Sequence, residues 1–395
     1  MTGGRDTGLG AVRVIDPSLF TAPYDEALVA ALGRAGADAQ LVTRPARAGE
    51  AELAAQVPVR RKWYRWCDAA PRKLGALGAA LKAGEHVVSS LVHLVALRKS
   101  GAAHFQWLPF PLADRFLLAL WRRMMPVVVT VHDTEPFNNT PTSPVQRWGF
   151  AKALRQAHQL IVHTEQGRAR LVALGLDEAR ISVIPHGVGD APQGVGPAPG
   201  GARWCLVLFG KIRPYKGVDL LVEAAARLPE AVRAGLRIVI AGEPMMDLAP
   251  LEARIAEAGL ADCVELRPGY LDEAGMAALF GEADGFVFPY REIEASGVLY
   301  QVAGLHRWLI ASDIGAFKEA MTGSGAGALV AAEDVAALAA AIAHGATERP
   351  QPQGRIAAMA WDDVAARTVD VYEAAARDFA ARLDQKGRRA ERVGS

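Results

Sequence analysis

The chain has 395 residues, of which 51% are hydrophobic and 22% are charged, and its formal net charge is +1. This length is too great for one ordinary hydrophobic core and predicts two or three domains. The composition excludes a disordered chain and a general binder of nucleic acid, so any basic site must be local.

The cysteines and the apolar stretches indicate where the protein works. Cys67, Cys205 and Cys263 lie far apart and lack metal-binding or redox spacing, which predicts buried thiols in a reducing compartment. The N-terminal stretch has no basic region followed by an apolar core, so no signal peptide is expected. The most apolar stretches, VVSSLVHLVAL and FLLALW, are shorter than the ~20 residues of a membrane span. We therefore expect a cytoplasmic protein that contacts the inner face of a membrane at most peripherally.

Short Val- and Ile-rich runs alternate with longer Ala/Leu segments of helical period, a pattern typical of parallel α/β sheets. The strand candidates, in chain order, are VRVID, AQLVT, AAHFQW, VVVTVH, LIVHT and ISVIP, then WCLVLF, LRIVIAG, CVELRPG, GFVFPY and WLIAS. Residues 187–201 between the two sets are rich in Gly and Pro, which predicts a linker.

We therefore predict an α/β protein with two doubly wound, Rossmann-like domains, residues 1–190 and 202–360, facing a cleft between them. Residues 361–395 begin with an amphipathic helical pattern, and we expect this helix to pack back on the first domain. Ligands of such sheets bind beyond the carboxyl ends of the strands.

Residues 60–74, RRKWYRWCDAAPRKL, interleave cations with Trp63, Tyr64 and Trp66. This mixture suits an anionic membrane surface or a lipid diphosphate. The alternative is a helix that packs its aromatic residues and uses its cations for solubility. The near-neutral chain argues against a nucleic-acid partner.

His132 follows the strand candidate VVVTV, where a doubly wound sheet presents ligands. It is either a site residue or a structural histidine that caps or lines a loop. Asp133 and Glu135, which follow it, are candidate acceptor-side carboxylates. His163 and His186 also lie at strand ends, where we expect them to shape loops.

Residues 209–217, FGKIRPYKG, form the loop between the strand WCLVLF and a predicted helix. Gly210 allows close backbone approach, and Gly217 stands where the free N–H groups of a helix start favour an anion. Arg213 and Lys216 can converge on one anion, for which a diphosphate is well suited. The alternative is a solvated basic loop.

A second strand-end loop, beginning after GFVFP, carries Glu292, Glu294 and Ser296 before a helix that starts at Gly297. The helix start can bind a phosphate while the carboxylates accept from sugar hydroxyls, a combination that predicts a nucleotide-sugar. The alternative is an ordinary capped helix with Ser296 as its cap.

The motifs FGKIRPYKGVDLLVEAAARL, RIVIAGEP, GYLDEAGMAALFGEADGFVFPYREIEASGVL and LIASDIGAFKEAM together resemble the donor-binding half of the family 4 retaining glycosyltransferases of GT-B fold, of the bacterial polysaccharide and glycolipid type. HFQWLPFPLADRFLLAL, VVVTVHDTEPF, LIVHTEQGRARL and ISVIPHGV resemble the acceptor half. The resemblance covers nearly the whole chain, with the motifs in order.

The resemblance implies a catalytic set of His132, Arg213, Lys216 and Glu294, with the two cations on the donor diphosphate and His132 near the transferred sugar. It also implies a donor site that includes Gly210, Tyr270, Glu292, Ser296, Gly297, Val298 and Gln301. The family's E-x7-E motif is incomplete here. Val302 stands eight residues after Glu294, and Gln301 takes the place of the second Glu if the match is anchored on RWLIAS.

The resemblance implies transfer of a sugar from a UDP- or GDP-linked donor to a sugar or lipid-linked hydroxyl, with retention and with no metal or other cofactor. The alternatives are a sugar-nucleotide epimerase or hydrolase of the same fold, and a degenerate domain that binds nucleotide or carbohydrate as a scaffold. The incomplete E-x7-E motif favours the scaffold, whereas the pair Arg213 and Lys216 favours an enzyme.

Overall fold

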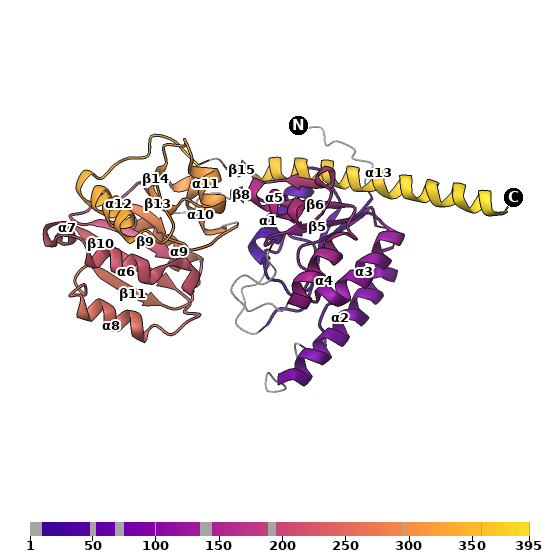
Figure 1. The fold of residues 1–395 in the computed structure, drawn as a ribbon, viewed down its shortest axis with the longest axis horizontal. Helices are drawn as coiled ribbons and strands as arrows, with labels where there is room; N and C mark the ends of the chain where they lie inside the picture. The colour runs from indigo at the N-terminus through magenta and orange to yellow at the C-terminus, as the bar shows by residue number, and fades with distance from the viewer. Residues whose placement is uncertain are drawn as a thin grey trace. The chain divides into compact units, whose positions relative to one another are not determined.

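The computed structural model describes residues 10–47, 53–67, 75–98, 100–134, 144–188, 195–294, 297–356 and 358–394. The chain divides into two compact units (Figure 1). The first comprises Met1–Gly187 and Ala360–Ser395, and the second comprises Val188–Met359. The second unit therefore begins within the predicted linker, where Val195 packs against a hydrophobic core of that unit.

The first unit contains a seven-stranded sheet in the order β3-β2-β1-β4-β5-β6-β7, and every neighbouring pair is parallel. Its strands are β1 (Val12–Asp16), β2 (Ala39–Thr43), β3 (Val59–Arg61), β4 (Ala102–Phe105), β5 (Val127–Val131), β6 (Gln159–Val162) and β7 (Ile181–Val183). The order reverses between β1 and β4, which is the switch point where such a sheet opens a crevice at its carboxyl edge.

Helices cover both faces of this sheet, because its strands are apolar on both sides. The helices are α1 (Ala22–Arg34), α2 (Gly75–Leu97), α3 (Pro111–Met124), α4 (Pro144–Leu154), α5 (Glu165–Ala173) and α13 (Trp361–Gly394). One core joins the sheet to α2, α3, α4 and α5. On the other side α13 contacts α1 and the strands β4, β5 and β6.

The second unit repeats this plan with a six-stranded sheet in the order β11-β10-β9-β12-β13-β14, again wholly parallel. Its strands are β9 (Trp204–Phe209), β10 (Leu236–Gly242), β11 (Val264–Pro268), β12 (Gly285–Phe288), β13 (Trp308–Ser312) and β14 (Gly327–Val330). Its switch point lies between β9 and β12. A separate two-stranded sheet pairs β8 (Gly187–Val188) with β15 (Met359–Ala360).

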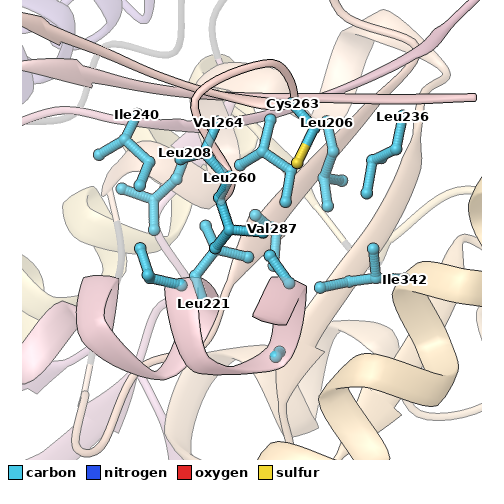
Figure 2. Packing of buried hydrophobic residues seen from close by; sticks show 14 of the residues in the cluster. Leu206, Leu208, Leu221, Leu236, Ile240, Leu260, Cys263, Val264, Val287 and Ile342 are labelled. Carbon is cyan, nitrogen blue, oxygen red and sulfur yellow. The ribbon is translucent and has the colours of Figure 1, made fainter. Parts of the chain in front are cut away.

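Two hydrophobic cores enclose the second sheet. Its helices are α6 (Val218–Ala226), α7 (Glu230–Ala234), α8 (Ala249–Glu257), α9 (Glu273–Glu282), α10 (Gly297–Val302), α11 (Gly315–Met321) and α12 (Val335–Glu348). Leu206 and Leu208 of β9 face the core under α6 and α12, where Leu221 and Ile342 meet them (Figure 2). Val207 and Phe209, between them in sequence, face the opposite core under α9, α10 and α11. Successive side chains of β9 thus point to opposite faces of the sheet and contribute to both cores.

Every strand predicted from the sequence is present, so the two-domain α/β prediction is confirmed. The edge strands β3 and β14 were not predicted, because VRR and GALV are too short and too weakly apolar to stand out. The argument that the apolar stretch VVSSLVHLVAL is shorter than a membrane span is wrong, because this stretch belongs to a longer helix. VVSSLVHLVAL is the end of the 23-residue helix α2, whose window Ala80–Leu97 is long and apolar enough to cross a membrane by length and composition, with 39% of it buried.

Candidate active site

The loops after β9 and β12 flank the switch point of the second unit. Residues 210–217 run from β9 to α6, and residues 289–294 follow β12 on the neighbouring strand. Gly217 has φ 65°, and a Cβ there would collide with the carbonyl oxygen of Pro289. The two loops predicted from the sequence are therefore packed directly on one another.

Lys216 is a buried cation at this junction, with 4% of its surface exposed. Its Nζ donates to the carbonyl oxygen of Phe209 at 3.2 Å and lies 5.4 Å from the centre of the Tyr290 ring. Burial, and then the charges of Arg213 and Lys211, lower the pKa of Lys216 to about 7. The part of the chain that the structure describes gives Lys216 no carboxylate partner. An uncompensated buried cation is unfavourable, and an anionic ligand would offset that cost.

Gly210 makes room for this cation. It has φ 93°, and a Cβ there would lie 2.9 Å from Lys216 Nζ and 3.3 Å from Val298 Cγ1. Glycine is therefore required both by the backbone and by the space that the lysine occupies. Val298 of α10 also lies beside Gly210.

Arg291 joins the two loops, and it was not among the residues predicted from the sequence. Its guanidinium makes a two-pronged ion pair with Asp219 at 2.9 and 2.6 Å and donates to the carbonyl oxygen of Pro214 at 2.8 Å. Its backbone N–H also donates to the carbonyl oxygen of Tyr215 at 2.8 Å. Arg291 thus fixes the 210–217 loop against the end of β12.

The other predicted donor-site residues are spread more widely. Glu294 is buried, and its carbonyl oxygen accepts from Ala316 N at 3.2 Å at the start of α11. Glu292 and Gly297 are exposed on the same loop and helix start, and Arg213 is half-buried. Ser296 lies outside the described residues.

Tyr270 is not brought to this junction. It follows the edge strand β11, which is separated from β9 by β10, and its side chain is 72% exposed. The role of Tyr270 in the donor site thus stays a prediction.

In the first unit, a small pocket opens at the carboxyl ends of β4 and β5. Its lining comprises Gln106, Trp107, Leu108, Val129, Thr130, Val131, His132, Asp133 and Phe150. His132 and Asp133 thus lie where the sequence placed them, and Glu135 lies outside the described residues. The His132 ring stacks on Trp107 at 5.2 Å and meets the edge of Tyr24 at 4.9 Å.

A hydrogen-bond chain fixes His132. His163 Nδ1 lies 3.0 Å from the carbonyl oxygen of Ile184, so it must carry the proton. His163 Nε2 then accepts from His132 Nδ1 at 3.0 Å. His132 Nε2 lies 2.9 Å from Gln106 Oε1. In a neutral His132 this nitrogen can only accept, so the Gln106 amide must turn its nitrogen toward the ring.

These histidines are neutral because they are buried together. Burial lowers the pKa of His163 to about 4, and burial with the neighbouring His163 charge lowers the pKa values of His104 and His186 to about 3. The pKa of His132 is also lowered well below its usual range, by burial and then by the other three histidines. Since both ring nitrogens of His132 are bonded within the protein, the ring is positioned as part of the pocket wall rather than as a free base.

Among the described residues, no group of three or more His, Cys, Asp and Glu side chains is arranged to hold a metal ion. Lys216 lies near two further cations of the same loop, Arg213 and Lys211, whose charges act on it.

Comparisons with known proteins agree with this geometry. Residues 204–347 match the family described as "Glycosyl transferases group 1", and residues 26–191 match "Glycosyltransferase Family 4". HepE of Anabaena, solved in complex with UDP, shares the fold with a TM-score of 0.67 and 14% identity over 95% of this chain and 100% of that chain. The chain belongs to the family 4 glycosyltransferases of GT-B fold.

A second solved structure and a curated relative are also similar to this family 4 chain. Sucrose-phosphate synthase of Thermosynechococcus elongatus matches with a TM-score of 0.65 and 17% identity, over 97% of this chain and 100% of that chain. D-inositol 3-phosphate glycosyltransferase of Mycobacterium tuberculosis is 27% identical over 300 residues, which is 68% of this chain. The match spans 61% of the length of that curated relative.

This member of family 4 departs from the family motif at the position of the second Glu. Val302 is buried in the core under α10, so it contributes only packing. Gln301 is exposed on the same helix, where its amide is accessible to a ligand. The structure thus leaves Gln301, and not Val302, as a polar group at this end of the motif.

Proposed function

We propose that this family 4 protein transfers a sugar from a nucleotide-diphosphate donor, UDP- or GDP-linked, to a hydroxyl acceptor with retention of configuration. The observation that carries the proposal is the buried and uncompensated Lys216 at the switch point of the second unit, with Arg213 three residues before it. A diphosphate satisfies both cations at once, the arginine as a fork and the lysine as a point charge.

In this proposal the protein works by positioning and charge. The bond from the sugar C1 to the phosphate oxygen breaks while the acceptor hydroxyl bonds to C1 on the same face, and the hydroxyl proton passes to the departing phosphate oxygen. Arg213 and Lys216 stabilise the negative charge that builds on the leaving diphosphate, a role that needs no bound metal. Glu292 and Glu294 accept from donor hydroxyls, and Gly297, Ser296 and Gln301 complete the donor site.

The first unit is then the acceptor side. His132 and Trp107 form the wall of its pocket, and Asp133 supplies a carboxylate beside them. We propose a sugar or a lipid-linked acceptor in bacterial polysaccharide or glycolipid assembly, and a cytoplasmic protein that works at the inner face of the membrane. The 60–74 stretch contributes less to membrane contact than its sequence suggests, because Trp63 and Tyr64 are fully buried and only Trp66 is exposed.

The experiment is a release assay with a panel of UDP- and GDP-sugars, in buffer with chelator and without added metal. Transfer predicts release of the nucleoside diphosphate, loss of release in Lys216→Ala, and an α product from an α donor by NMR. An altered sugar that stays on the nucleotide would indicate an epimerase. Nucleotide binding with no turnover of any donor would favour the scaffold suggested by the incomplete E-x7-E motif.

A further inference from the structure

Helix α2 buries a set of polar side chains and exposes a set of apolar ones, although Leu94 and Leu97 at its end join the core. The buried polar residues are Glu85, His86, Ser89, Ser90 and His93. The exposed apolar residues are Leu77, Leu81, Val88, Leu91, Val92 and Val95. A surface helix of a globular protein normally shows the reverse arrangement, so the outward face of α2 requires a separate explanation.

The inward residues hold α2 in this orientation. His86 Nε2 lies 2.7 Å from Asp114 Oδ1 of α3, and its Nδ1 lies 2.7 Å from the Tyr64 hydroxyl. Trp121 Nε1 donates to Ser90 Oγ at 3.0 Å. Rotating α2 to bury its apolar side, or removing it to cross a bilayer, would break these buried hydrogen bonds.

Helix α3 extends the exposed apolar surface. The α2–α3 face is the exposed set on α2 named above together with Leu112, Phe116, Leu120 and Met124 of α3. The four α3 residues recur every fourth position and so lie along one side of the helix, opposite the buried Leu117, Leu118 and Trp121. The two helices are in contact and lie side by side in Figure 1.

The solvent-reaching charges on the segments that carry this face have one sign. The only carboxylates on α2 and α3, Glu85 and Asp114, are buried. The charged side chains that reach solvent on the described parts of 60–67, 80–98 and 111–124 are Arg60, Arg61, Lys62, Arg65, Lys82, Arg98, Arg115, Arg122 and Arg123. Arg115 lies over the ring of the exposed Phe116, 5.0 Å from its centre. Along α3, Arg115 and Arg123 thus alternate with the exposed apolar side chains.

We propose that the α2–α3 face docks on the surface of an anionic lipid bilayer, with α2 and α3 in the plane of the interface. Apolar and aromatic side chains enter the headgroup boundary while the surrounding cations bind anionic headgroups. A second copy of this chain is a poorer occupant, because a symmetric contact would set these cations against one another. Membrane docking rests on the proposed function with a lipid-linked acceptor. Its test measures vesicle binding and uses no transfer reaction, so membrane docking and sugar transfer can fail separately.

The test is co-sedimentation of the full chain with sucrose-loaded vesicles of phosphatidylglycerol and phosphatidylcholine, against vesicles of phosphatidylcholine alone. We expect pelleting with the anionic vesicles that weakens as salt is raised. Phe116→Gln with Leu120→Gln should lower the partition coefficient by about tenfold or more, because it removes the apolar contribution. Arg115→Gln with Arg123→Gln should weaken binding and flatten its salt dependence.

The control is Val172→Gln with Leu174→Gln, which places the same side chains at exposed apolar positions at the end of α5 in the same unit. It should bind as the unaltered chain does, and thermal melts of all variants check that each is folded. No pelleting with anionic vesicles at low salt would overturn the proposal, as would equal pelleting of the Phe116 and Leu120 variant. Light scattering that shows a dimer dissociated by that variant would instead assign the face to a second copy.

Discussion

His163 Nε2 lies 3.0 Å from His132 Nδ1, and this one contact couples the β6 end of the first sheet to the pocket at the end of β5. Because His163 Nδ1 is bonded to a carbonyl oxygen, the proton between the two rings belongs to His132. The arrangement holds only while both imidazoles are neutral.

We therefore predict that the first unit loses stability as the pH falls from 7 to 5. The folded pKa values of His104, His163 and His186 are about 3 to 4, below the ordinary value of 6.5, so the unfolded chain binds protons that the folded unit excludes. The stability is present above the unfolded pKa and lost below it, at up to ~1.4 kcal/mol per pH unit for each histidine. Urea unfolding followed by tryptophan fluorescence at pH 7 and pH 5 measures the loss.

The buried Asp25 also changes the pH dependence of stability, so the measurement should be repeated in a variant that lacks this carboxyl group. Burial and the neighbouring Asp16 raise its pKa well above 3.8, so its own contribution is present at low pH and lost as the pH rises, opposite in sign to that of the histidines. Asp25→Asn removes this opposing contribution, and the acid loss should be steeper in that variant. An unfolding midpoint that does not change between pH 7 and pH 5 in Asp25→Asn would show that the histidines are not buried neutral.

Gly210→Ala should damage the donor site more than the fold. The new methyl group would lie 2.9 Å from Lys216 Nζ, and alanine at φ 93° is strained by about 1–3 kcal/mol. We expect weaker nucleotide binding with a modest drop in melting temperature. Gly259→Ala is the control, because Gly259 also has positive φ but nothing lies within 4 Å of the added Cβ. Nucleotide binding that is equally strong in both variants would contradict the placement of Lys216.

Arg291→Lys tests whether the two loops of the donor site must be held together. Lysine keeps the charge but cannot form the two-pronged pair with Asp219 while bonding the Pro214 carbonyl. Since the pair is partly exposed, the stability loss should be only about 1 kcal/mol or less. Nucleotide affinity should fall by more than this, and calorimetry beside a thermal melt separates the two. Arg254→Lys, which alters the partly exposed pair with Glu223 in the same unit, should change neither.

The sequence was enough to predict the parallel sheets, because the buried strands are near-continuous apolar runs between turn signals. It also placed the 210–217 loop and His132 at the carboxyl edges of the two sheets, because each directly follows a predicted strand of a parallel sheet. The partners of His132 could not be predicted, since Gln106 and His163 come from other strands and meet it only in the folded sheet. For Trp63 and Tyr64 the sequence left open a membrane contact or a packing role, and the structure supports packing, because both side chains lie in the core of the first unit.

The orientation of α2 is also absent from the sequence pattern. Hydrophobic periodicity marks two faces of a helix without saying which one points inward, and here the buried hydrogen bonds of His86 and Ser90 decide it. Arg291 was missed because a single cation after a strand has no meaning until its partners Asp219 and Pro214 are seen.

The most direct test of the account is calorimetry of UDP and GDP binding across pH 6 to 9, in metal-free buffers of different ionisation enthalpy. The pKa of Lys216 is about 7 in the free protein, and a bound diphosphate must raise it, so binding should take up close to one proton near pH 8 and weaken as the pH rises. Lys216→Arg should bind without this uptake, and Lys216→Ala should bind at least about tenfold more weakly. Binding of neither nucleotide, or binding to Lys216→Ala with unchanged affinity and proton uptake, would contradict the central claim.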